Sequence, residues 1–256
     1  MSFKTPVKII LGTHTVGDPT EIPGIAHFDS AKQVQALLDV FHSRGYRHID
    51  TASNYFGSEV RLGQAGAASR FTIHTKVAGF GKPGDHEPSK IDLSIGQSLD
   101  ALETSVVETM FLHVPDRQTP FKDTAKAMND AFRQVLQPVF FSGNTGTSTR
   151  WKHDNIIGKL YSTLYGHPAV QASVAVVRDA AEKHGISGHA AAVRWTAFHS
   201  VLDGKYGDGL IFAVSKMEQL YKTLDALEAG PLSDDLAEAI TAIYGTLDGA
   251  EPPYHL

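Results

Sequence analysis

The chain has 256 residues, a formal net charge of −5 and 42% hydrophobic residues, which suits one domain over residues 1–256. Its 23 basic residues are scattered among 28 acidic ones, so we expect no nucleic-acid partner, because a phosphate backbone needs a concentrated Lys/Arg surface. With no cysteine, disulfides, thiolate metal sites and a cysteine nucleophile are excluded.

The N-terminal residues Met-Ser-Phe-Lys-Thr-Pro lack the basic-then-apolar pattern of a signal peptide. No apolar stretch approaches the roughly 20 residues of a membrane span. We therefore expect a cytoplasmic protein without a membrane partner. Thirteen histidines are present, but no His-Glu-x-x-His or comparable cluster appears, so no metal site is expected.

Short apolar runs alternate with helical patterns along the first half of the chain, which is typical of repeated βα units. Four strands are predicted, over residues 7–12, 48–52, 71–77 and 106–113.

Three helices are predicted between and after these strands. Asp29 or Ser30 caps the first, and Gly45 is its stop signal. Ser89 and Asp92 resemble a capping box at the start of the second. The third spans residues 121–135. The first two carry apolar faces, made of Val34, Leu37, Leu38 and Phe41 and of Ile91, Ile95, Leu99 and Leu102.

Four ionisable residues each lie at, or just past, the C-terminal end of a predicted strand: Asp50, Tyr55, Lys76 and His113. In a parallel α/β barrel those strand ends surround the active site. Taken singly, they also fit a helix cap, a packing aromatic, a solvated strand end and a core histidine. Their recurrence at successive βα spacings favours a common site.

Their chemistry gives such a site a rationale. A free tyrosine has a pKa of about 10 and is a poor acid at neutral pH unless a nearby cation stabilises its phenolate. Lys76 would supply that cation, and Asp50 would hold the lysine and balance its charge. His113 would orient a substrate carbonyl and contribute to proton transfer.

The local sequences HIDTASNYFGSE, HTKV and FLHVPDRQTP resemble the signature of the aldo-keto reductases. The resemblance implies a (β/α)8 TIM-type barrel in which Asp50, Tyr55, Lys76 and His113 form the catalytic tetrad and Tyr55 protonates a carbonyl. The aspartate that follows His113 resembles the aflatoxin-aldehyde-reductase branch.

The resemblance resumes near the C-terminus, where residues 190–200 match the penultimate helix and residues 206–214 the last barrel strand. Ser215, Lys216 and Gln219 then stand where the family binds the 2′-phosphate of NADPH. Ala213 and Thr223 replace the glycine and asparagine of the family loop. An ordinary capped helix start is the alternative reading, although a hydroxyl and a cation at a helix N-terminus suit an anion.

The chain departs from the family between Arg133 and Asn144. In the family, a Ser-Gly-Asn sequence follows the seventh strand. In this chain the same three residues, at 142–144, follow almost directly after the third predicted helix. The resemblance therefore implies an internal deletion of about three βα units, with its junction near 134–144, and a truncated or incomplete (β/α)8 barrel. The missing strands would carry the residues that hold the nicotinamide.

A barrel short of three strands cannot close, and open sheet edges invite pairing with another chain. A homodimer or a covering helix is therefore expected. Residues 151–167 could form that cover, with ordinary packing of a loop on the barrel as the alternative.

Three functions remain open at this point. The first is NADPH-dependent reduction of an aldehyde or ketone, with a small-molecule carbonyl substrate. The second is a cofactor-independent isomerase, dehydratase or cyclase that reuses the four residues for proton chemistry, which Ala213 and Thr223 favour. The third is a non-catalytic remnant or an incomplete gene model.

Overall fold

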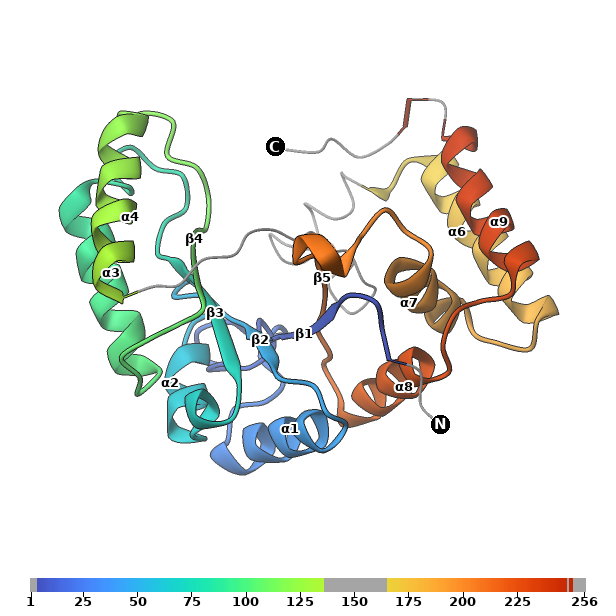
Figure 1. Cartoon of the computed structure of the whole chain (residues 1–256), viewed down its shortest axis with the longest axis horizontal. Helices are drawn as coiled ribbons and strands as arrows, with labels where there is room; N and C mark the ends of the chain where they lie inside the picture. Colours follow the sequence, from blue (N-terminus) through green and yellow to red (C-terminus); the bar gives the residue numbers. More distant parts are fainter. Residues whose placement is uncertain (1–3, 136–164, 248, 251–256) are drawn as a thin grey trace. The chain divides into compact units, whose positions relative to one another are not determined.

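A computed structural model describes residues 4–135, 165–247 and 249–250 of the chain. The described residues fall into two compact units (Figure 1). Residues 8–135 and 207–217 belong to one, and the remainder to the other. The sequence-based expectation of a single domain stays a prediction. The deletion junction near 134–144 and most of the candidate cover at 151–167 lie outside the described residues.

The first unit is built on a parallel five-stranded sheet with the order β4-β3-β2-β1-β5. The strands are β1 (Lys8–Gly12), β2 (His48–Asp50), β3 (Thr72–Val77), β4 (Thr109–Leu112) and β5 (Gly209–Phe212). All five predicted strands are thus confirmed, although each is shorter than predicted.

Local turns before two of the strands explain why those strands are shorter than predicted. Before β4, the Thr104 hydroxyl donates to the Val106 carbonyl oxygen and accepts from the Val106 amide, so the chain turns there instead of pairing. Before β5, Tyr206 lies in the 3-10 turn η3 (Gly204–Tyr206). Strand length therefore follows turn chemistry that the apolar pattern does not contain.

The strand order identifies the kind of sheet. The last strand, β5, pairs with the first, with Lys8 to Leu11 in register with Gly209 to Phe212. A closed barrel also places its last strand beside its first, and βα units build parallel sheets of this kind. The first unit is therefore an incomplete (β/α)8 barrel with five strands among its described residues.

Helix α1 (Ala31–Ser43) begins as the sequence predicts. Ser30, rather than Asp29, is its N-cap: the Ser30 hydroxyl accepts from the Gln33 amide, and the Gln33 side chain accepts from the Ser30 amide. Gly45 follows the helix with a φ of 87°, where a left-handed residue ends it. The four predicted apolar residues of its face are all buried.

The capping box predicted at Ser89 is wrong. Helix α3 (Pro88–Ala101) begins two residues earlier than a Ser89 cap would place it, because Pro88 occupies the first helical turn, where its fixed φ suits the helix and its missing N–H costs nothing. Its N-cap, Glu87, makes no side-chain hydrogen bond. Helix α4 (Phe121–Val135) is confirmed, whereas α2 (Ser58–Gln64) and the turn η1 (Ala67–Ser69) were not predicted.

The two faces of the sheet differ in chemistry. Residues in register on neighbouring parallel strands point to the same side. Asp50, His74 and Thr109 are in register and share what we call the inner face with Lys76. The opposite face is apolar and packs against helices, with Leu11, Ile49, Ile73 and Val77 all buried. Phe41 of α1 contributes to that packing, stacked on the ring of Phe71.

The second unit is helical. It contains α6 (Pro168–Lys183), α7 (Gly188–Phe198), α8 (Met217–Glu228), α9 (Asp234–Ala242) and the turn η4 (Ile243–Thr246). The first residue of α8, Met217, belongs to the first unit. Its core consists of Ala181, Ala191, Leu232, Leu236, Ala237 and Ile240. The helix predicted at 190–200 is confirmed as α7, capped by the Ser187 hydroxyl. None of the described helices combines the length and hydropathy needed to cross a membrane.

Candidate active site

The structure brings together the four residues that the sequence singles out. Asp50 is the last residue of β2, Lys76 lies one residue before the end of β3, and His113 directly follows β4. Tyr55 lies in the loop between β2 and α2. All four stand at the C-terminal ends of neighbouring parallel strands, as predicted.

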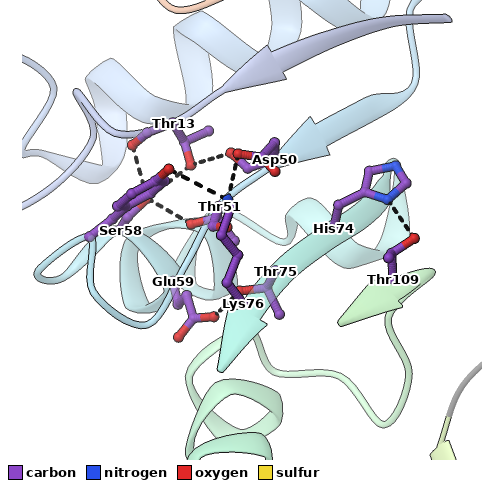
Figure 2. Close-up of polar contacts among 10 residues, drawn as sticks. Thr13, Asp50, Thr51, Ser58, Glu59, His74, Thr75, Lys76 and Thr109 are labelled. Carbon is purple, nitrogen blue, oxygen red and sulfur yellow. Dashed lines mark hydrogen bonds and ion pairs between the residues drawn. The ribbon is translucent and has the colours of Figure 1, made fainter. Parts of the chain in front are cut away.

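The ammonium group of Lys76 is the centre of the arrangement (Figure 2). Its Nζ donates to the Asp50 carboxylate at 2.7 Å, to the Thr51 carbonyl oxygen at 2.7 Å and to the Tyr55 hydroxyl at 3.4 Å. A lysine ammonium has three hydrogens, and each now has an acceptor. One of these acceptors is the phenolic oxygen, so the cation stands where it would stabilise a phenolate.

Asp50 is held on two sides. Its side chain is 7% exposed and pairs with Lys76, while its carbonyl oxygen accepts from the amide and hydroxyl of Thr13 at 2.9 and 3.0 Å. Burial raises the pKa of the Asp50 carboxyl, and the Lys76 ammonium opposes that rise. The ion pair with Lys76 offsets the cost of burying the Asp50 carboxylate.

Three aromatic side chains meet at Tyr55. The His113 ring stands edge-on to the phenol with centroids 5.5 Å apart, and the His14 ring lies at 4.7 Å. Lys76 Nζ is 4.9 Å from the centroid of the same phenol. The phenol thus has two imidazoles and one ammonium around it.

His113 is neutral at physiological pH. Burial and, to a smaller extent, the Lys76 charge lower its pKa to about 4. Its Nδ1 is buried and has no hydrogen-bond partner among the described residues. A neutral imidazole beside the phenol is a hydrogen-bond donor to a substrate oxygen rather than a second cation.

The loops that carry Tyr55 and His113 are linked to the loop after β3. The Asn54 side chain donates to the Gly79 carbonyl oxygen at 2.6 Å and accepts from the Gly79 amide at 3.3 Å. Asp116, three residues after His113, accepts from the amides of Gly84 and His86. The hydrogen bond from the Thr119 hydroxyl lowers the pKa of the Asp116 carboxyl most, and the amides of Gln118, Thr119 and His86 lower it further.

The three predicted cofactor residues lie at the start of α8. Ser215 and Lys216 precede the helix and belong to the first unit, whereas Gln219 lies in the first turn and belongs to the second. Lys216 is exposed. Thr223, which stands in place of the family asparagine, is buried and engaged within its unit: its hydroxyl donates to the Gln219 carbonyl oxygen and hydrogen-bonds to His189.

Sequence reasoning missed His14, Asn54 and Asp116 as contributors to this site. His14 lies two residues past the end of β1, so the rule that selected the other four residues applies to it as well. Asn54 and Asp116 carry no such signal. Their partners are backbone groups of other loops, and only the tertiary structure identifies those.

Comparisons with known proteins agree with this geometry. Residues 8–134 match the model of the aldo/keto reductase family. The protein named Oxidoreductase sirO of Leptosphaeria maculans is 24% identical over 319 residues, covering 97% of this chain and 97% of that protein. The human aflatoxin B1 aldehyde reductase member 2 is 24% identical over 341 residues, covering 99% and 91%.

A solved structure of a thermostable aldo-keto reductase, in complex with the inhibitor epalrestat, has the same fold. It superimposes with a TM-score of 0.62 at 17% identity, over 95% of this chain and 99% of that one. The alignment with the Leptosphaeria protein is 319 residues long and this chain has 256, so more than sixty of its positions lack a counterpart here. The place of the shortening, near 134–144, stays a prediction.

Proposed function

Because the chain belongs to the aldo/keto reductase family, we propose that it reduces an aldehyde or ketone with NADPH, with Tyr55 as the proton donor. The observation that carries the proposal is the geometry of Lys76, whose ammonium donates one hydrogen bond to the Asp50 carboxylate and another to the Tyr55 hydroxyl. A reductase of this family needs that pairing to make a phenol acidic at neutral pH.

In the proposed mechanism, the substrate carbonyl oxygen lies between Tyr55 and His113. The neutral His113 donates a hydrogen bond that orients the carbonyl. As negative charge develops on the oxygen, Tyr55 gives up its hydroxyl proton to it, and the nearby Lys76 ammonium stabilises the phenolate that remains. Asp50 keeps Lys76 in place and charged. NADPH, when bound, supplies the hydride.

The residues before α8 fit the adenosine-phosphate end of NADPH by their chemistry. Ser215 offers a hydroxyl, the exposed Lys216 a cation and Gln219 a side-chain amide, all at the N-terminal end of a 12-residue helix. A helix N-terminus with such side chains is suited to a phosphate. We assign no described residue to the nicotinamide end.

Substitution of Tyr55 tests the acid role directly. We expect Tyr55→Phe to lower kcat/KM for aldehyde reduction by about 100-fold or more, because it removes the donated proton and leaves the ring in place. NADPH absorbance measures the rate. Tyr206→Phe is the matched control, because Tyr206 is 73% exposed and belongs to the other unit. Full activity in Tyr55→Phe would refute the assignment.

Lys216 tests the cofactor site. We expect calorimetric titration with NADPH to give saturable binding that Lys216→Ala weakens by about tenfold, since one charge-assisted hydrogen bond contributes about 1.5–3 kcal/mol at most. Lys205→Ala is the control for removing an exposed lysine, because Lys205 pairs with Asp203 elsewhere. A folded protein that does not bind NADPH would contradict the reductase proposal.

One observation favours the second candidate, a cofactor-independent acid–base enzyme. The Thr223 hydroxyl hydrogen-bonds to the Gln219 carbonyl oxygen and to His189 within its own unit. This replacement of the family asparagine therefore has a structural role that does not involve a cofactor. The tetrad geometry serves isomerisation, dehydration or cyclisation of a carbonyl compound equally well. Turnover of a carbonyl substrate without NADPH, abolished by Tyr55→Phe, would establish this alternative.

The remaining parts of the proposal concern partners and location. We propose a small carbonyl compound as substrate, a cytoplasmic location, and a homodimer that covers the open edges of the sheet. The edges in the described part of the chain are β4 and β5.

A further inference from the structure

Glu59 is a buried carboxylate that the proposed mechanism does not use. It lies in the first turn of α2 and is 7% exposed. Among the described residues no ion pair within 4.0 Å includes it. Burial raises the pKa of its carboxyl group. Burying a polar group costs free energy unless it is hydrogen-bonded, so its partners need to be identified.

Three hydroxyl groups from three elements converge on this carboxylate. The Thr75 hydroxyl of β3 donates to Oε1 at 2.5 Å. The hydroxyls of Ser98, on α3, and Ser53, in the loop after β2, donate to Oε2 at 3.2 and 3.3 Å. The Ser53 and Ser98 oxygens are also 2.8 Å apart, and because each hydroxyl has one hydrogen, a serine that donates to the other does not donate to Glu59 at the same time. All of these donors oppose the rise in the pKa of Glu59, so they favour its ionised form.

Two of these donors are neighbours of the tetrad in sequence. Thr75 directly precedes Lys76, and its side chain points to the helix side of β3 while Lys76 points to the inner face (Figure 2). Ser53 lies two residues before Tyr55, and its amide donates to the Lys76 carbonyl oxygen at 3.3 Å. Glu59 is therefore hydrogen-bonded to the side chain next to Lys76 in β3 and to a side chain of the loop that carries Tyr55.

The Tyr55–Lys76 contact depends on the relative position of that strand and that loop. At 3.4 Å between Lys76 Nζ and the Tyr55 oxygen, a small displacement of either element would break it. The ammonium of Lys76 donates its other two hydrogens to the Asp50 carboxylate and the Thr51 carbonyl oxygen. These two bonds hold the ammonium in place, but they do not hold the phenol of Tyr55.

We propose that Glu59 is a positioning residue for the acid–base step: its carboxylate joins β3, α3 and the loop after β2, and so sets the distance between Tyr55 and Lys76. It acts through Thr75 and Ser53 and touches neither substrate nor cofactor. The inference deepens the proposed function and rests on it for its catalytic consequence.

The first test does not require turnover. NMR of ring-labelled tyrosine follows the titration of Tyr55, whose resonance is assigned by its absence in Tyr55→Phe. In Glu59→Ala we expect the midpoint of Tyr55 to move upward by about half a pH unit or more, because the phenol loses its cation. Simple removal of a nearby negative charge would move it downward. An unchanged or lowered midpoint overturns the proposal.

Two further variants make the result specific. Glu59→Gln keeps the size and one acceptor oxygen, so its midpoint should lie closer to that of the wild type than the Glu59→Ala midpoint does. Thr75→Val, nearly isosteric, removes only the hydroxyl beside Lys76 and should also raise the midpoint; it replaces Glu59→Ala if that variant does not fold. Thr104→Val, at a half-buried position, and Glu182→Ala, at an exposed one, lie outside the network; they are the controls and should titrate like the wild type.

Kinetics separate the two proposals. If the chain is a reductase, Glu59→Ala should lower kcat by about 10- to 100-fold with a small change in KM, since a displaced proton donor affects the chemical step. An unchanged kcat in the folded variant overturns the positioning role and leaves the reductase proposal intact. Absence of activity in the wild type contradicts the reductase proposal, and the Tyr55 titration still tests Glu59.

Discussion

Gly57 has a backbone conformation that the loop of Tyr55 requires. It lies two residues after Tyr55, at the N-cap of α2, with a φ of 77° and a ψ of 0°. A Cβ at this position would lie 2.3 Å from Arg61 Nη1, the end of a flexible side chain that also bonds to the Gly57 carbonyl oxygen. Glycine avoids both the left-handed strain and this clash.

We therefore expect Gly57→Ala to lower the free energy of unfolding by about 1–2 kcal/mol, the cost of a left-handed alanine. It should also reduce activity, because the loop carries Tyr55. Urea denaturation measures the first effect. Gly96→Ala is the matched control: Gly96 lies inside α3 with nothing within 4 Å of its Cβ position, so alanine should stabilise the helix by about 0.5–1 kcal/mol. Equal effects at both positions would contradict the argument.

At the scale of single elements, helix ends depend on local side chains that can be exchanged one at a time. Both halves of the α1 capping box are present, between Ser30 and Gln33. Such a cap satisfies two amides that the helix itself leaves without acceptors. The α3 start works differently, since Pro88 has no amide hydrogen to satisfy.

Ser30→Ala should lower the free energy of unfolding by about 1 kcal/mol, as measured by urea denaturation. Ser43→Ala, at the other end of the same helix, is the control. The Ser43 hydroxyl donates to the Val40 carbonyl oxygen, is exposed, and caps no amide, so its loss should change stability by only a few tenths of a kcal/mol. Similar losses for the two variants would show that the capping box does not stabilise α1.

On the scale of the whole sheet, the inner face is polar where a closed barrel has a packed interior. Below the tetrad, His48 Nδ1 lies 3.1 Å from His74 Nε2, and His74 Nδ1 lies 3.0 Å from the Thr109 hydroxyl. The chain of contacts runs across β2, β3 and β4. Burial and, less strongly, His48 and the lysines Lys8 and Lys76 lower the pKa of His74 to about 4.

This histidine makes the first unit sensitive to acid. The unfolded chain binds a proton at His74 near pH 6.5, whereas the folded unit does so only near pH 4, so stability falls as the pH decreases between those values. The expected contribution of His74 to this loss, from about pH 7.5 to about pH 4.5, is about 2–3 kcal/mol. His113, whose pKa is also lowered to about 4, adds to the loss in the same direction. The raised pKa values of Asp50 and Glu59 act in the opposite direction and reduce the net change.

Comparison with His74→Gln isolates the contribution of His74. The stability difference between wild type and variant, measured by urea denaturation at both pH values, should shift by those 2–3 kcal/mol in favour of the variant at low pH. Parallel pH curves for wild type and His74→Gln would show that His74 is not the acid-sensitive group.

The sequence by itself determined the order of the five strands along the chain, four of the helices (α1, α3, α4 and α7), the face of α1 that is buried, and the four residues at the strand ends. These features are local: apolar periodicity, turn residues and the spacing of βα units contain them. The positions of Asp50, Tyr55, Lys76 and His113 follow from one rule of parallel sheets, that the C-terminal ends of neighbouring strands meet at one edge.

Only the tertiary structure decided which groups serve those four residues. The bonds of Glu59 to Thr75, Ser98 and Ser53, and of Asn54 to Gly79, join residues that are 6 to 39 positions apart in the sequence. Such contacts depend on how helices pack behind the strands, and no periodicity predicts them. The sequence selects the chemistry of the site, and the packing around it fixes the distances on which that chemistry depends.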